Sequence, residues 1–292
     1  MIQPLFEHRL TLAGFNTRVL ELEGDGLPIA LFHGYADSAD TWRQSLALIA
    51  RQGRRAVAFD LPGFGTADRL RPDPILPQLD DFALAAVRYV AGRERAPVVA
   101  VGNSLGGCVT LRLAERHSDK LAGVVGVAPA GLEMNRLLYL VQRDPVLRSV
   151  VSLPTPVPAF VLRAAVARLY RQFAFAAPDS IDPGVISAFT FHHRQRGRVA
   201  HYLDTAHRLI PELRDPFALG RISVPVLLVW GDRDRVVFAR GAKRVLETVP
   251  DARLELLPGV GHCPQIEAFG RFTELLLRFG DERAAAAATA AA

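Results

Sequence analysis

The serine at position 104 is the first residue whose surroundings indicate chemistry, because it lies in a Gly-Asn-Ser-Leu-Gly run at 102–106. The apolar, β-branched run at 97–101 predicts a buried strand before it. Residues 108–117 follow with apolar side chains at helical spacing and basic residues at the far end. A serine at such a turn is typical of a nucleophile elbow, where a strained backbone exposes the hydroxyl. The alternative is a glycine-rich turn with an incidental serine.

A base and an acid must accompany such a serine, because its hydroxyl is a weak nucleophile at neutral pH. His262 follows the last predicted strand and is the candidate base. Asp232 and Asp234, in a Gly-Asp-Arg-Asp run, compete to orient it. The alternative for His262 is an exposed loop histidine, and the acid that is not used becomes a turn or cap residue. The chain order is serine, acid, histidine, and this order differs between serine hydrolase folds.

Parallel strands are the elements that can bring these side chains together. Short runs that are apolar on both faces predict such strands, with helical patterns between them. Active groups gather at the carboxyl edge of a parallel sheet. Residues 5–12 and 17–22 predict an N-terminal hairpin that turns at 14–16. The expected parallel strands cover residues 28–32, 55–59, 97–101, 121–127, 224–230 and 253–257.

The alternation of strand and helix breaks at residues 132–216. That segment has a helical pattern with proline punctuation and predicts an inserted helical cap. We therefore expect an α/β core formed by residues 1–131 and 217–283, with the cap between them. Residues 284–292 are alanine with one threonine and predict a frayed tail with no catalytic part.

Five short segments together resemble the cap-bearing α/β-hydrolase superfamily of esterases, lipases and carbon–carbon hydrolases. The segments are 33–35, 60–65, 102–107, 231–234 and 261–264. The resemblance covers nearly the whole chain outside the alanine tail. It implies an eight-stranded, mostly parallel sheet flanked by helices, with Ser104, Asp234 and His262 as the catalytic triad. It favours Asp234, the later acid, over Asp232.

An oxyanion hole is also implied, and it requires two backbone N–H groups at the developing negative charge. Leu105, directly after the nucleophile, is expected to supply one, and Tyr35 the other. His33 is interpreted as a structural, hydrogen-bonding histidine beneath this loop rather than as a second base. Epoxide hydrolases and haloalkane dehalogenases of this fold carry aspartate at the elbow. Ser104 instead implies an acyl-enzyme and a substrate with an attackable carbonyl.

The predicted cap contains further polar and aromatic side chains. Its metal-binding residue types are His192, His193, His201, His207 and Asp204. Their spacing matches no tight ligand motif, so cap surface is favoured over a metal site. A basic run comprises Arg194, Arg196 and Arg198. A solvated helix face is the first interpretation, and binding of a substrate carboxylate is the alternative. Apolar cap residues are 137–141, Phe160, Phe173, Phe175, Phe189 and Phe191. These indicate cap core, with a subset lining an apolar acyl or alcohol pocket.

Composition narrows the class of protein. The 292 residues are 50% hydrophobic, which suits one α/β domain with an insertion. The net charge of +5 comes from scattered arginines, which favours solvated surface over nucleic-acid binding. Cys108 and Cys263 are too few for a disulfide framework and are expected to be free thiols. No signal peptide or membrane-spanning run is visible, which predicts a cytoplasmic location without stable membrane insertion.

These patterns predict a serine hydrolase of a carboxylic ester or related acyl compound. No dinucleotide fingerprint follows an early strand, so neither NAD nor FAD is implied, and no cofactor or metal is expected. The expected partner is a small-molecule substrate with an apolar acyl or alcohol part, and homo-oligomer formation is left open. The first alternative is a carbon–carbon bond hydrolase of meta-cleavage-product type, although Cys263 and Pro264 stand where an aromatic residue is expected. The second is a non-catalytic small-ligand-binding protein on the same fold.

Overall fold

The computed structural model describes residues 4–92, 96–135, 168, 171–182, 184 and 196–291. Its strands are β1 Phe6–Leu12, β2 Phe15–Leu22, β3 Asp25–Phe32, β4 Arg54–Phe59, β5 Val98–Asn103, β6 Leu121–Val127, β7 Val226–Gly231 and β8 Ala252–Leu257. Its α-helices are α1 Arg43–Arg51, α2 Ile75–Ala91, α3 Leu105–His117, α8 Arg196–Glu212, α9 Ala242–Thr248, α10 Pro264–Glu267 and α11 Phe269–Ala291. Its 3₁₀ helices are η1 Ala39–Trp42, η2 Ser118–Lys120, η3 Pro178–Ser180, η4 Leu219–Arg221 and η5 Ala239–Gly241.

The strands form one eight-stranded sheet in the order β1-β2-β4-β3-β5-β6-β7-β8. The β1–β2 and β2–β4 pairs are antiparallel, and every other pair is parallel. The predicted α/β-hydrolase architecture is therefore confirmed. The hairpin turn lies at Ala13 and Gly14, one residue earlier and one residue shorter than the predicted turn at 14–16, because both residues adopt the positive φ that a tight two-residue turn requires.

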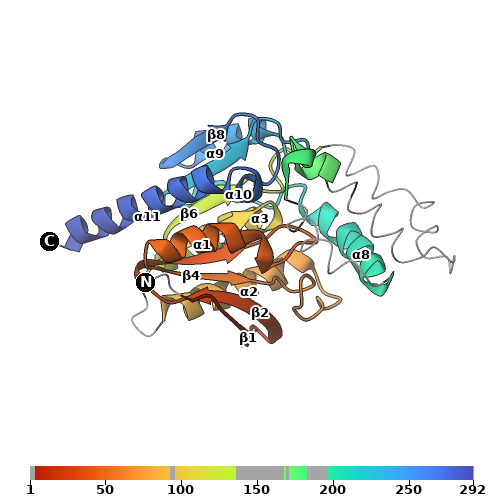
Figure 1. Ribbon diagram of the computed structural model, residues 1–292, viewed down its shortest axis with the longest axis horizontal. Helices are drawn as coiled ribbons and strands as arrows, with labels where there is room; N and C mark the ends of the chain where they lie inside the picture. The colour runs from red at the N-terminus through yellow and green to blue at the C-terminus, as the bar shows by residue number, and fades with distance from the viewer. Residues whose placement is uncertain are drawn as a thin grey trace.

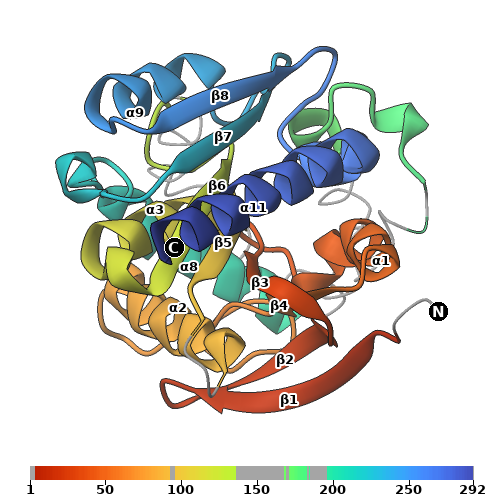
Figure 2. The ribbon, with the colours of Figure 1, turned by 90° about the vertical axis from the view of Figure 1, so that its left-hand side faces the viewer.

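Helices cover both faces of the sheet, which explains why its central strands are apolar on both sides. One hydrophobic cluster joins α1 and α11 to one face, through side chains such as Leu46 and Phe272. The other joins α2, α3 and α9 to the opposite face, through side chains such as Phe82 and Trp230. Figure 2 shows the sheet between these two layers. A rigid, doubly covered sheet holds the loops at its edge in fixed positions.

Most of the predicted cap at 132–216 lies outside the described residues. The described part includes α8, which lies on the side of the molecule away from both chain ends (Figure 1). Its C-terminal end is attached to the core, because the carboxylate of Glu212 accepts hydrogen bonds from Ile75 N and Leu76 N, both at 2.8 Å. Both N–H groups belong to the first turn of α2, so neither has an acceptor within that helix. The Glu212 carboxylate therefore caps the start of α2.

The alanine-rich end is helical in the structure, not frayed. Helix α11 continues from the core through residues 284–291. Alanine has the highest intrinsic helix propensity, so a helix that is already nucleated in the core propagates through an alanine run.

Candidate active site

Ser104 occupies a strained turn between β5 and α3. Its φ of 52° and ψ of −110° lie outside the regions that L-residues favour. The turn depends on two glycines. A Cβ on Gly102 would lie 2.1 Å from the carbonyl oxygen of Gly106, and one on Gly106 would lie 2.2 Å from that of Phe32. Backbone atoms on both sides therefore exclude any side chain, and the predicted elbow geometry is present.

The loop after β7 places Asp234 against His262. The Oδ2 atom of Asp234 lies 2.7 Å from His262 Nδ1 and accepts a second hydrogen bond from Trp230 Nε1 at 3.2 Å. Its Oδ1 atom accepts from the N–H groups of Val236 and Val237 at 2.8 and 3.0 Å. A carboxylate with four donors is held in one orientation, so Nδ1 of His262 keeps its proton and Nε2 is left as the basic nitrogen.

The competing acid has a different task. Asp232 Oδ1 accepts a hydrogen bond from Gly259 N at 2.7 Å, which ties the loop after β7 to the loop after β8. Its side chain is one-third exposed, whereas that of Asp234 is fully buried. Asp232 therefore has the turn role that was expected of the aspartate that does not orient the histidine.

The loop carrying His262 lies against the elbow. Asn103 Nδ2, in the residue before Ser104, donates to the backbone carbonyl of His262 at 3.1 Å. Counted as whole residues, backbone included, Ser104, Asp234 and His262 are 9%, 7% and 6% exposed and so are largely buried. Within the described part of the chain, no hydrogen bond joins Ser104 Oγ to the His262 ring. Such contacts are often long without substrate and tighten when substrate binds.

The two expected oxyanion donors flank the serine. Leu105 is the first residue of α3, so its N–H has no intrahelical acceptor. The loop carrying Tyr35 is tied to this helix start, because Gly106 N donates to His33 O at 3.1 Å. A Cβ on Gly34 would lie only 3.4 Å from the Cβ of Ser104. The loop after β3 therefore lies next to the serine turn, and the oxyanion roles of Leu105 N and Tyr35 N stay predictions.

His33 is fully buried and structural, as predicted. Its Nε2 accepts a hydrogen bond from Leu61 N at 2.8 Å, so Nδ1 carries the proton and donates to Gly34 O at 2.7 Å. The histidine thus bridges the loop after β3 and the loop after β4, and it is not available as a second base.

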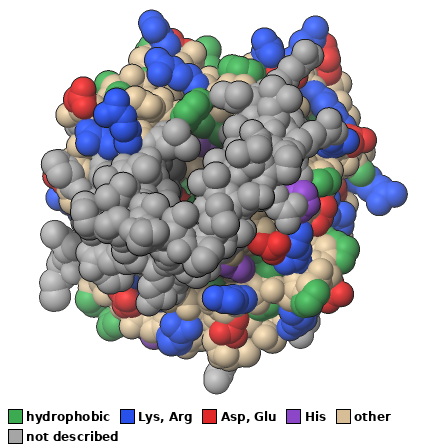
Figure 3. All heavy atoms as spheres, turned by 90° about the vertical axis from the view of Figure 1, so that its right-hand side faces the viewer, with side chains coloured by type: hydrophobic (Ala, Val, Ile, Leu, Met, Phe, Trp, Pro, Cys, Tyr) green, Lys and Arg blue, Asp and Glu red, His purple; other side chains and the backbone are tan. Residues whose placement is uncertain are grey.

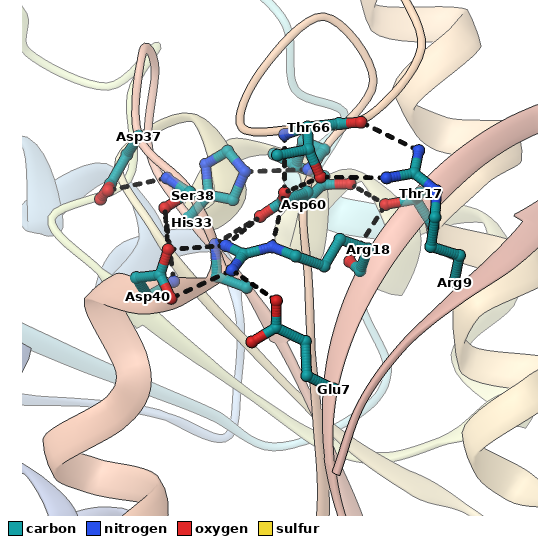
Figure 4. A network of polar contacts seen from close by, with 12 residues as sticks. Glu7, Arg9, Thr17, Arg18, His33, Asp37, Ser38, Asp40, Asp60 and Thr66 are labelled. Carbon is teal, nitrogen blue, oxygen red and sulfur yellow. Dashed lines mark hydrogen bonds and ion pairs between the residues drawn. The ribbon is translucent and has the colours of Figure 1, made fainter. Parts of the chain in front are cut away.

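A buried ionic network supports the same loop (Figure 4). The Asp60 carboxylate accepts from Arg18 Nε at 3.1 Å, Ala39 N at 2.8 Å and Thr66 N at 2.8 Å. Arg18 also pairs with Asp40 at 2.6 Å. Burial alone would raise the pKa of Asp60, but the Arg18 hydrogen bonds and charge outweigh it and lower the pKa below its usual value. In the sequence, 60–65 is one of the five segments that carry the family resemblance, and Arg18 has no local signal of its own.

The side chain of Tyr35 contacts the predicted cap. Its hydroxyl donates to the backbone carbonyl of Tyr202 in α8, and its ring packs edge-on against Phe64 with centroids 5.3 Å apart. Phe64 and Tyr202 stack at 5.9 Å. Burial raises the pKa of the Tyr35 hydroxyl well above its usual value, so it remains a donor. Helix α8 is therefore packed directly over the loop that carries one expected oxyanion donor.

The remaining cap predictions are only partly covered by the structure. His192, His193 and Arg194 lie outside the described residues, as do residues 137–141, Phe160, Phe189 and Phe191. His201 contacts Gly63 O at 3.0 Å through Nε2. No group of three or more potential metal ligands lies together among the described residues. On the face seen in Figure 3, Lys and Arg side chains are interspersed with acidic ones.

Comparisons with known proteins agree on one family. A family model described as the alpha/beta hydrolase fold matches residues 28–269. A 2-hydroxy-6-oxo-6-(2'-aminophenyl)hexa-2,4-dienoic acid hydrolase from Metapseudomonas resinovorans is 26% identical over 288 residues, or 95% of this chain and 92% of the relative. A non-heme haloperoxidase from Rhodococcus erythropolis is 28% identical over 257 residues, or 82% and 86%.

Solved structures share the fold. A meta-cleavage product hydrolase from Pseudomonas fluorescens superposes with a TM-score of 0.75 at 21% identity, covering 94% of this chain and 97% of the other. A thermophilic esterase from Thermogutta terrifontis superposes with a TM-score of 0.70 at 20% identity, covering 95% and 99%. None of the helices formed by described residues has the length and apolar character needed to cross a membrane.

Proposed function

Since the chain belongs to the alpha/beta hydrolase fold family, we propose that it is a serine hydrolase that cleaves a carboxylic ester or related acyl compound. The observation that carries this proposal is the pairing of His262 with Asp234 at 2.7 Å beside the strained serine turn. A strained serine, a histidine with an oriented tautomer and converging backbone N–H groups are the parts that acyl transfer requires.

The first half of the reaction forms the acyl-enzyme. Ser104 Oγ attacks the carbonyl carbon of the substrate while His262 Nε2 takes the hydroxyl proton. Asp234 stabilises the resulting imidazolium through its bond to Nδ1. The carbonyl oxygen becomes negatively charged and is stabilised by the N–H groups of Leu105 and Tyr35. The tetrahedral intermediate then expels the alcohol, which receives its proton from His262.

The second half returns the enzyme to its starting state. His262 removes a proton from water, and the hydroxide attacks the acyl carbon of the Ser104 ester. The same two N–H groups stabilise the second tetrahedral intermediate. Ser104 leaves with the proton held by His262, and the carboxylic acid product departs. No electron transfer occurs, and the side chains present supply every proton movement.

The direct test is covalent labelling. Wild-type protein incubated with a fluorophosphonate probe should be labelled at Ser104, and it should hydrolyse p-nitrophenyl esters of graded chain length. Ser104→Ala should lower kcat by about 10⁴-fold or more while the fold remains intact. Absence of labelling on a folded wild-type protein would contradict the proposal.

A second candidate reaction is supported by the relative named as a dienoic acid hydrolase, which matches this chain over 95% of its length. Its reaction would break a carbon–carbon bond beside a ketone of a vinylogous diketone acid. Against it, Cys263 and Pro264 follow the histidine where an aromatic residue is expected. Incubation with a coloured meta-cleavage dienoate would decide: loss of visible absorbance with wild type and none with Ser104→Ala would favour this candidate over ester hydrolysis.

The expected setting of the reaction is also a proposal. The apolar residues of the predicted cap support a substrate with an apolar acyl or alcohol part. Cys108 and Cys263 are buried free thiols, which supports a reducing cytoplasmic location. Fractionation of cells that express the protein would test the location.

A further inference from the structure

The carboxylate of Glu267, at the end of α10, joins the histidine loop to a segment of the predicted cap. Its Oε1 accepts a hydrogen bond from Gly261 N at 2.9 Å, and its Oε2 accepts one from Ala176 N at 2.8 Å. Gly261 directly precedes His262. The backbone N–H of His262 itself donates to Ala174 O at 2.7 Å. The loop that carries the proposed base is thus hydrogen-bonded to residues 171–177, drawn in green in Figure 1.

The packing at this junction leaves little room for movement. A small apolar cluster seals it, formed by Ala174, Phe175, Ile181, Cys263 and Ile266. A Cβ on Gly261 would lie 2.7 Å from both Ala174 O and Ala176 N. Close backbone packing and a bridging carboxylate together define one position for the loop, because a shift of either segment would break at least one hydrogen bond.

We propose that Glu267 is a positioning residue for His262, and that through it the cap segment 171–177 sets where the imidazole lies relative to Ser104. This inference rests on the proposed function, since it concerns the same base. Catalysis by His262 requires Nε2 to reach the serine hydroxyl, and a displacement of about 1 Å can lower a rate about 100-fold. Nothing in the role of Glu267 requires contact with the substrate.

The charge of Glu267 also acts on the site. Burial raises the pKa of Glu267 above its usual value, three backbone N–H groups oppose that rise, and the nearby Asp234 charge adds to it. Two carboxylates thus lie near His262, Asp234 in direct contact and Glu267 through the loop.

Two substitutions separate the bridge from the charge. Glu267→Gln keeps the shape but presents an amide NH₂ to either Gly261 N–H or Ala176 N–H, so one hydrogen bond becomes a donor–donor contact. Glu267→Asp keeps the charge but is too short to reach both N–H groups. Glu274→Gln is the matched control, because Glu274 pairs with exposed Arg271 on α11 and has no other ion pair within the described ranges.

For both Glu267 variants we expect kcat on a p-nitrophenyl ester to fall about 10- to 100-fold with KM within about threefold, and fluorophosphonate labelling of Ser104 to slow in parallel. Because both variants lose one of the two hydrogen bonds, both should be slowed, although only Glu267→Asp keeps the charge. The control should match wild type. Circular dichroism and urea unfolding confirm that each variant is folded.

The outcomes distinguish the two proposals. One outcome is that wild type is labelled and the folded Glu267 variants react at the wild-type rate, or differ from wild type only by a higher KM. The positioning role is then wrong and the hydrolase proposal stands. If folded Glu267→Asp, which keeps the charge, reacts at the wild-type rate while Glu267→Gln is slow, the charge and not the bridge matters, and the positioning role is wrong. If folded wild type is not labelled, the hydrolase proposal fails and the inference fails with it.

Discussion

Asp234→Asn is the substitution whose outcome the structure defines most closely. The amide oxygen of asparagine must accept from Val236 N and Val237 N, because an NH₂ group there would face two N–H donors. The NH₂ group therefore takes the place of Oδ2, beside His262 Nδ1. Nδ1 then has to accept a hydrogen bond, so the imidazole proton moves to Nε2. In that tautomer Nε2 cannot take the proton from Ser104.

The magnitude follows from this change of tautomer. We expect kcat/KM to fall about 10⁴-fold, the scale known for the same change in a serine protease triad, which corresponds to about 5.5 kcal/mol of transition-state stabilisation. The fold should survive, since Trp230 Nε1 keeps a second acceptor, Val237 O, at 2.9 Å. Loss of the charged acceptor should lower the free energy of unfolding by about 1.5–3 kcal/mol.

The assay is ester hydrolysis at saturating and limiting substrate, together with urea unfolding of each variant. Asp232→Asn is the matched control two residues away, because its carboxylate accepts a hydrogen bond from Gly259 N and pairs with Arg233, and it does not contact His262. It should keep activity within about tenfold. The reasoning is refuted if Asp232→Asn is as damaging as Asp234→Asn, or if folded Asp234→Asn retains more than about a tenth of wild-type activity.

Three further outcomes are expected. Gly106→Ala should lower the free energy of unfolding by about 3 kcal/mol or more in urea titrations, because its Cβ would lie 2.2 Å from a backbone oxygen of β3. The control is Gly280→Ala in α11, where the added Cβ meets no atom, and it should raise the free energy of unfolding by up to about 1 kcal/mol. Burial raises the pKa of Asp37 to about 8, so the contribution of Asp37 to stability should decline from about pH 4 to pH 8. Over this pH range the free energy of unfolding of Asp37→Asn should rise relative to that of wild type, by at most about 1.4 kcal/mol per pH unit. A difference between the two free energies that does not change with pH would contradict this. Tyr35→Phe loses one hydrogen bond to α8 and should be about 1 kcal/mol less stable, yet keep kcat within about tenfold, since the backbone N–H remains.

Much of the fold was predictable because its signals are local. The doubly apolar strands, the glycines around Ser104 and the histidine after the last strand each reflect a backbone requirement of their own neighbourhood. The alanine tail was misinterpreted for the same local reason. Its low complexity was weighed above its helix propensity, although α11 was already available to propagate into it.

The residues that the sequence analysis missed have partners far along the chain. Glu267 acts on Ala176, and Arg18 acts on Asp60, across separations of 91 and 42 residues. A single glutamate after a histidine, or an arginine in an edge hairpin, has no pattern that distinguishes it from surface charge. Their roles exist only once the sheet order has brought separate loops together.

The chain's own residue spacing determined the elbow, the sheet and the order of serine, acid and histidine, because short-range sterics and hydrophobic periodicity act between neighbouring residues. The residue types alone left two aspartates open, the family resemblance favoured Asp234, and the tertiary structure shows Asp234 against the histidine. Asp232 and Asp234 are two positions apart on one loop, and their directions depend on how that loop packs between β7 and β8. Likewise, only the assembled fold decides which carboxylates hold the loops in place, since the two sides of each hydrogen bond come from distant parts of the chain.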